Sequence, residues 1–177
     1  MKTGKTSKFV FTAWARAIAL IFAFGLVSAM AMAAEFSGLV VGVSDGDTIK
    51  VLDENRHVHT VRLMGVDAPE KAQAWGQRSK QSLSELVFQK TVFVQWSKRD
   101  KYGRTVGKVL APDGLDVCMQ QITRGMAWHY KKYAGEQSAE DQVQYANAEK
   151  MAHESGVGLW QDEAPVPPWI WRHSITR

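Results

Sequence analysis

The stretch Arg62-Leu63-Met64-Gly65-Val66-Asp67-Ala68-Pro69-Glu70 is the one around which the chain is organised. It begins as a strand, because β-type residues lead into it and turn residues bound the run on both sides. Arg62 lies within this strand, and Asp67 follows just past its end. Pro69 has a fixed φ, which stiffens the backbone between Asp67 and Glu70. The stretch therefore predicts a strand that ends in closely spaced charges.

The end of this stretch combines several oxygen donors with one guanidinium. Asp67, the backbone carbonyl of Ala68 and Glu70 together offer ligands that suit a hard cation. Arg62 beside them suits a phosphate group. On these residues alone, an ordinary surface loop with charged side chains explains the stretch equally well.

Working outward, short strands and one helix surround the stretch. A three-strand meander is expected first, followed by a helix between the third and fourth strands. The expected strands are Phe36 to Val43, Thr48 to Leu52, His57 to Met64, Thr91 to Trp96 and Thr105 to Leu110, and the helix is Trp75 to Phe88. Asp116 is expected to cap a second helix that stops at Gly125, and Ser138 with Asp141 a third that runs to about Ser155. This pattern predicts a mainly β, α+β fold: a five-stranded Greek-key barrel of the oligonucleotide/oligosaccharide-binding (OB) type with three helices.

Residues 1–34 have the features of a secretory signal peptide. Basic residues precede an apolar run from Ala17 to Val27, and small residues with an A-x-A site follow it. The alternative is a retained membrane anchor, because the segment is about long enough to span a bilayer. The domain is expected over residues 35–162, and 163–177 form a Pro- and Trp-rich tail expected to lie extended on its surface. A stacking role toward substrate stays open for Trp169 or Trp171.

Removal of the first 34 residues changes the charge balance. The whole chain carries 22 Lys and Arg against 18 Asp and Glu, and four of the basic residues but none of the acidic ones lie in that segment. The remaining chain is formally neutral, so any basic site must come from local clustering. Cys118 is the only cysteine, which excludes an intramolecular disulfide, and it is expected to be buried. His57 and His59 share a strand face. We interpret them as residues of an exposed strand face in preference to a pair of metal ligands.

Two further motifs carry charges toward the same end of the predicted barrel. Asp45-Gly46-Asp47-Thr48 lies at the first hairpin, where its carboxylates can converge with Asp67. Asp100-Lys101-Tyr102-Gly103-Arg104 precedes the fifth strand and is expected to place Arg104 across the barrel from Arg62. Two guanidiniums in that arrangement could clamp one phosphate.

The motifs DGDT, RLMGVDAPE and DKYGR, in this order and spacing, closely resemble the staphylococcal nuclease (thermonuclease) family. The resemblance covers about Phe36 to Trp160 and includes the closing Gly156-x-Gly158-Leu159-Trp160. It implies the barrel with three helices and a calcium-dependent hydrolysis of phosphodiester bonds in DNA and RNA.

The resemblance also implies roles for individual residues. It makes Asp47, Asp67 and the Ala68 carbonyl the Ca²⁺ ligands. Asp45 would lie next to these ligands without contacting the ion itself. Glu70 would position or deprotonate the attacking water, and Arg62 and Arg104 would hold the phosphate. Nucleotide contacts would come from four residues, namely Lys101, Tyr102, Tyr130 and Tyr133.

The resulting prediction is an exported nuclease, secreted or periplasmic, that acts on DNA and RNA. It is expected to be a monomer without a stable protein partner and to have no membrane association after signal cleavage. An alternative is a nucleic-acid-binding OB module that kept the fold and lost turnover. A barrel that binds saccharide or protein is a third interpretation, which leaves Arg62, Arg104 and Glu70 unexplained.

The signal-peptide assignment predicts a mature N-terminus between Met32 and Phe36. N-terminal sequencing of the exported protein measures this directly. An intact Met1 terminus recovered from the membrane fraction would instead support the anchor.

Overall fold

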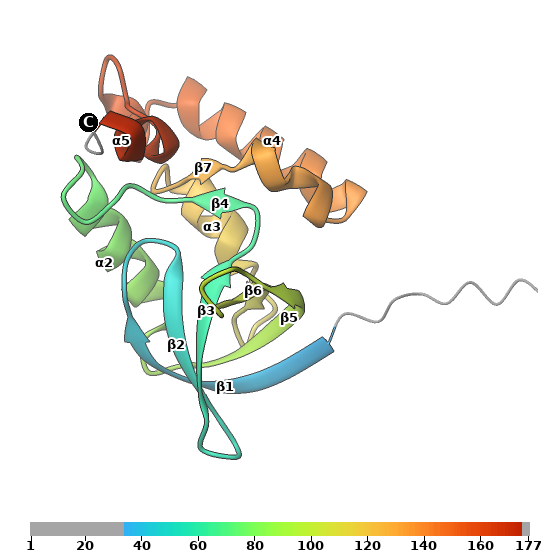
Figure 1. The fold of residues 1–177 in the computed structure, drawn as a ribbon. Coiled ribbons are helices and arrows are strands. Elements are labelled where there is room, and N and C mark those ends of the chain that lie inside the picture. Colours follow the sequence, from blue (N-terminus) through green and yellow to red (C-terminus); the bar gives the residue numbers. More distant parts are fainter. Residues whose placement is uncertain (1–33, 175–177) are drawn as a thin grey trace, which may run out of the picture. The chain divides into compact units, whose positions relative to one another are not determined.

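The computed structural model describes residues 34–174 (Figure 1). The predicted signal peptide therefore lies, apart from Ala34, outside the described residues. Within residues 34–174, every helix is too short or too polar to cross a bilayer.

Five strands close into a barrel, which confirms the predicted architecture. Their order around the barrel is β1-β2-β3-β6-β5, so the first three form a meander and β5 returns to pair with β1. All neighbours are antiparallel except β3 and β6, which pair in parallel. The strands are β1 (Ala34–Val43), β2 (Thr48–Asp53), β3 (Val58–Leu63), β5 (Thr91–Arg99) and β6 (Thr105–Leu110).

The barrel interior is filled mainly by β-branched and leucine side chains, and buried positions recur at every second residue in parts of β3, β5 and β6. Val51, Val61, Val94 and Val109 are completely buried, each from a different strand. Closing the sheet on itself leaves no free edge in the barrel, and one face of every strand then points into the interior. The core therefore follows from the period-2 pattern of the sequence.

The three predicted helices are present: α2 (Gly76–Val87), α3 (Val117–Thr123) and α4 (Ala139–Glu154). The cap of α3 is confirmed, because Asp116 accepts a hydrogen bond from the backbone N–H of Met119. The cap of α4 is likewise confirmed, since Ser138 accepts from the N–H of Asp141. Two short 3₁₀ helices, Lys131–Glu136 and Gly158–Gln161, flank α4.

The expectation of an extended C-terminal tail is wrong. Its last described part forms a short helix, α5 (Pro168–Ser174). A proline is well suited to the first turn of a helix, because its missing N–H has no partner there in any case. The tail consequently presents its aromatic and basic side chains at helical spacing instead of alternating them.

A small second sheet lies between the end of the barrel and part of the helical layer. The short strand β4 (Val66–Asp67) pairs antiparallel with β7 (Trp128–His129). In Figure 1 this pair lies between the barrel below and α4 and α5 above. Asp67, which was expected just past a strand end, therefore lies inside a strand of its own and is buried.

Two minor expectations can also be compared with the structure. Cys118 is fully buried, as predicted. The Nε2 atom of His59 lies 2.8 Å from Asp53 Oδ2, and His57 also approaches Asp53, so these histidines share a carboxylate partner.

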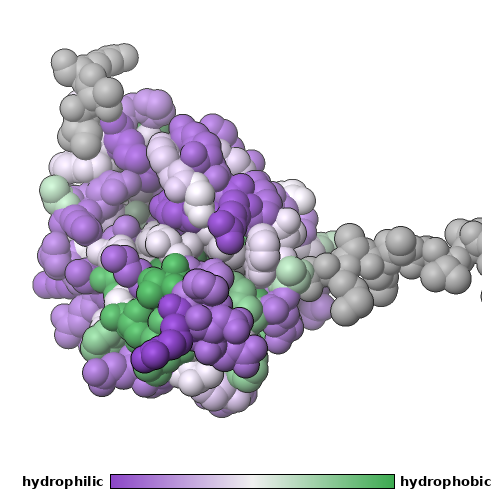
Figure 2. All heavy atoms as spheres, turned by 60° about the horizontal axis from the view of Figure 1, so that its bottom comes forward, coloured by the Kyte–Doolittle hydropathy of each residue, from purple (hydrophilic) through white to green (hydrophobic). Residues whose placement is uncertain are grey.

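An apolar patch occupies part of the face turned forward in Figure 2, and exposed apolar residues of the barrel strands include Leu39 and Val58.

A buried polar network joins the barrel to α3 and α4. Lys108 of β6 contacts Asp141 Oδ1 at 2.6 Å and Asp116 Oδ2 at 3.2 Å. The hydroxyl of the fully buried Tyr145 donates to Asp116 Oδ2 at 2.8 Å. Burial acts to lower the pKa of Lys108, but the two carboxylates outweigh burial and raise it. This network fixes the helical layer against the strand that leads away from the Asp100–Arg104 loop.

Tyr145→Phe is expected to reduce the free energy of unfolding by about 1–3 kcal/mol, because the variant loses a buried hydrogen bond to a charged acceptor. Urea denaturation measures the change. Val143→Ala on the same helix is the control, since Val143 is 61% exposed and its truncation should stay within about 0.5 kcal/mol of the parent.

Candidate active site

All of the predicted site residues line one cavity at the end of the barrel. Its volume is about 680 Å³. The lining includes every residue assigned from the sequence, namely Asp45, Asp47, Arg62, Asp67, Ala68, Glu70, Lys101, Tyr102, Arg104, Tyr130 and Tyr133. The fold therefore gathers three separate motifs at one place, while the role of each residue stays a prediction.

The two central aspartates converge through the backbone of the organising stretch. Asp47 Oδ2 accepts a hydrogen bond of 2.8 Å from the N–H of Ala68, and Asp47 Oδ1 accepts one from the Thr48 hydroxyl. Asp67 directly precedes Ala68. The carboxylates of Asp47 and Asp67 are both buried. The stiff segment before Pro69 thus binds the first hairpin directly.

Arg62 holds these two aspartates together. Its Nη2 lies 2.9 Å from Asp67 Oδ1, and its Nη1 lies 3.2 Å from Asp47 Oδ2. The same Nη1 donates to the carbonyl oxygens of Leu63 and Val66. The side chain is only 13% exposed, so Arg62 is a buried brace of the site.

Arg104 immediately precedes β6, the parallel neighbour of the strand that contains Arg62, and so does not lie across the barrel from Arg62. The two residues flank a parallel pairing, in which Val61 of β3 stands opposite Thr105 of β6. Arg104 donates from Nε to Asp100 Oδ2 at 2.7 Å, and Asp100 also accepts from the backbone N–H groups of Tyr102 and Arg104. Burial acts to raise the pKa of Asp100, but these hydrogen bonds outweigh burial and lower it.

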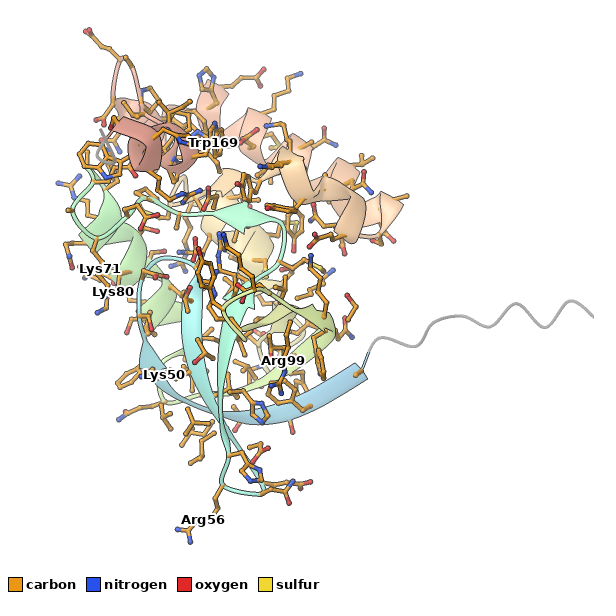
Figure 3. The ribbon with its side chains drawn as sticks, in the orientation of Figure 1. Lys50, Arg56, Lys71, Lys80, Arg99 and Trp169 are labelled. Atoms are coloured by element: carbon orange, nitrogen blue, oxygen red, sulfur yellow. The ribbon has the colours of Figure 1, made fainter. Side chains whose placement is uncertain are left out.

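Aromatic and basic side chains border the acidic centre. Tyr102 is 71% exposed, and the Lys101 ammonium lies 4.9 Å from its ring centroid. Tyr130 and Tyr133 meet edge to face with their centroids 5.0 Å apart. The face of Tyr130 is covered by Trp169 of α5, which stacks at 5.5 Å with an interplanar angle of 12° (Figure 3 labels Trp169).

Sequence reasoning missed Arg172. This residue of α5 donates from Nη2 to Asp67 Oδ2 and from Nη1 to Glu70 Oε1, both at 2.8 Å. It lies 102 residues from Glu70 along the chain, in a tail to which no motif pointed. The basic and aromatic composition of the tail was a weak signal, and only the helical spacing of Trp169 and Arg172 indicates that both can reach one surface.

The gathered carboxylates disturb one another's ionisation. Burial and the neighbouring charge of Asp47 raise the pKa of Asp45 to about 6. Burial also raises the pKa of Asp67, although Arg172 and Arg62 act in the opposite direction. The contacts with the two arginines thus offset only part of the cost of burying the Asp67 carboxylate.

Comparison with known proteins agrees with this geometry. The family model described as staphylococcal nuclease homologue matches residues 60–162. The chain belongs to the staphylococcal nuclease family. An "Uncharacterized endonuclease" of Escherichia coli O157:H7 is 43% identical over 142 residues, which cover 80% of this chain and 88% of that protein. A "Micrococcal nuclease" of Shigella flexneri is 41% identical over 149 residues, with 80% and 83% covered.

A third relative, an "Uncharacterized endonuclease" of Haemophilus influenzae, is 41% identical over 133 residues, with 75% of this chain and 71% of that protein covered. Family membership supports a nuclease activity of the endonuclease, hydrolase type, for which nucleic acids are the substrates. It also confirms the family resemblance that the three motifs carried. The matched region ends before α5, so the contacts of Arg172 come from outside it.

Asp45→Asn is expected to stabilise the protein near neutral pH. A carboxyl whose folded pKa is about 6, against an ordinary value of 3.8, binds more protons in the folded state, so its contribution to stability falls as the pH rises through this interval. An amide does not ionise and avoids this loss. Thermal unfolding in chelator at about pH 7.5 should show a gain on the order of 1–2 kcal/mol, after allowance for solvent screening. The gain should vanish near pH 4; a gain independent of pH would refute the explanation.

Proposed function

We propose that the protein is an exported, calcium-dependent nuclease that hydrolyses phosphodiester bonds of DNA and RNA with little selectivity for the sugar. The observation that carries the proposal is the single cavity lined by the buried Asp47 and Asp67 together with Glu70, Arg62 and Arg104. Such a set matches a reaction in which water attacks a phosphate anion and negative charge grows on the phosphate oxygens. The family membership supports the same class of reaction.

The donor chemistry of the site fits a hard divalent cation. Asp47 and Asp67 converge on one guanidinium at 3.2 and 2.9 Å, so their oxygens face a common point of positive charge. Within residues 34–174, no group of three or more His, Cys, Asp or Glu side chains is placed to hold a metal ion, so the protein would supply only part of the ligands. Asp47, Asp67 and the Ala68 carbonyl would hold the ion together with water and substrate oxygens. When bound, Ca²⁺ would neutralise a phosphate oxygen and orient the water.

The side chains of the protein divide the remaining work. Arg104 is 30% exposed and would exchange its contacts with Asp100 to reach a phosphate, whereas Arg62 would exchange part of its carbonyl and carboxylate contacts. Glu70 is 40% exposed and lines the same cavity, where it would accept a proton from the water or fix its orientation. Lys101 with Tyr102 would contact the nucleotide, together with Tyr130 and Tyr133.

The second candidate function is a nucleic-acid-binding barrel without turnover. It is favoured by one observation: Arg62, Asp67 and Glu70 all have protein partners in this structure, as in a closed electrostatic network. Hydrolysis of a plasmid or of RNA by the purified domain separates the two functions. Export and a monomeric state without stable protein partners belong to the same proposal and are tested by cell fractionation and by the solution mass.

Glu70→Gln is expected to lower the rate of cleavage of a short oligonucleotide by on the order of 100- to 10,000-fold, because an amide cannot accept the proton. Binding of a nucleotide that is not hydrolysed should stay within a few-fold of the parent, since Glu70 is not assigned to the phosphate. Single-turnover kinetics and calorimetry measure the two quantities. If the parent protein still cleaves in excess chelator, the reaction does not require a metal ion and the proposed calcium dependence is wrong.

Arg104→Lys should reduce the cleavage rate by about 100- to 1000-fold, since lysine keeps the charge and loses the planar pair of donors. Arg56→Gln is the matched control: Arg56 is exposed at the hairpin between β2 and β3 and points away from the barrel in Figure 3. If Arg104→Lys cleaves at the parent rate, the guanidinium does not act on the phosphate.

A further inference from the structure

We propose that Arg172 is an internal cation of the active site, which holds the Asp67 and Glu70 carboxylates until a divalent metal ion displaces it. The C-terminal helix α5 then sets the metal affinity of the nuclease. This inference rests on the assignment of Asp67 as a metal ligand in the proposed function. It adds a residue beyond the end of the matched family region to the control of the site.

The contacts of Arg172 cover the open side of the Asp67 carboxylate. Nη2 lies 2.8 Å from Oδ2 and Nη1 lies 3.2 Å from Oδ1, which is a two-pronged pairing. Nη1 also lies 2.8 Å from Glu70 Oε1. The Asp67 side chain is 2% exposed while that of Arg172 is 40% exposed, so the guanidinium stands between the carboxylate and solvent.

A metal ion and this guanidinium compete for the same oxygens. Arg62 of β3 already contacts Asp67 Oδ1, and Arg172 takes both oxygens of the same carboxylate. A hard cation that coordinates Asp67 needs one of these lone pairs and would stand next to a second positive centre. Binding of the metal therefore requires the guanidinium to withdraw.

The fold allows the side chain to withdraw while the helix stays in place. Trp169 anchors α5 on the ring of Tyr130, and the carbonyl of Val166 accepts a hydrogen bond of 2.5 Å from Gln73 Nε2. Arg172 lines both the catalytic cavity and an adjoining groove of about 1220 Å³. The groove also contains Lys131 and Lys132, so it would accommodate a nucleic-acid phosphate that offers the released guanidinium a new anionic partner.

Calorimetric titration of the full mature protein with calcium chloride, without nucleic acid, tests the exchange. Arg172→Gln is expected to bind Ca²⁺ about 10- to 100-fold more tightly than the parent, because the parent must first break a charge-assisted pairing of corresponding strength. Arg172→Lys should fall between the two, because it keeps the charge and loses the two-pronged geometry. Arg56→Gln removes the same unit of charge far from the site and measures the general effect of net charge.

A second measurement separates exchange from a purely structural tie. In chelator, Arg172→Gln should be less stable to urea than the parent, because Asp67 loses a partner, while its Ca²⁺ affinity rises. A structural tie alone would lower both quantities. If Arg172→Gln does not fold, Arg172→Lys carries the same test with a smaller expected gain.

Calcium affinity in Arg172→Gln equal to or weaker than that of Arg56→Gln overturns the inference, as does the absence of measurable Ca²⁺ binding in all variants. Because the titration contains no nucleic acid, its result is independent of turnover. Tighter binding by Arg172→Gln in a protein that cleaves neither DNA nor RNA would keep this inference and remove the nuclease function. Unchanged affinity in an active nuclease would do the reverse.

Discussion

The bridge that Arg62 forms between Asp47 and Asp67 is the interaction on which the functional end of the barrel depends. One buried side chain joins the first hairpin to β4, and its bonds to the carbonyls of Leu63 and Val66 fix the corner between β3 and β4. Buried carboxylates without such partners would cost several kcal/mol each. The family motifs supply this arginine together with the two aspartates whose burial it helps to offset.

This bridge does not remove the whole cost of burying the carboxylates. Burial and Asp47 still raise the pKa of Asp45 to about 6, and burial still raises the pKa of Asp67. A buried carboxylate whose pKa is raised by burial destabilises the folded chain when it ionises, and a cation that enters the cavity would offset this cost. Stability given up at a functional site in this way is expected where ligand binding restores it.

Much of the architecture could be predicted from local signals. The strand Thr105–Leu110 and the caps Asp116 and Ser138 depend on nearby residues, and the structure reproduces them. The parallel pairing of β3 with β6 depends on closure of the barrel, which no local pattern encodes. It places Arg104 at the start of the strand next to that of Arg62. The role of Arg172 could not be predicted for the same reason. Its partners are about a hundred residues away along the chain, and the short helix that positions it contains no family motif.

The position of α5 explains how a short C-terminal segment can act on a site built by the barrel. Residues three apart on a helix share a face, so Trp169 and Arg172 reach the site together. Trp169 stacks on Tyr130 while Arg172 reaches Asp67 and Glu70, and one small helix therefore covers both the aromatic and the acidic half of the cavity. A change confined to this helix alters the competition for Asp67 without touching Asp47, Arg62 or Arg104. Because α5 follows the region that the family model matches, it adds contacts to the site without any change in the three motifs.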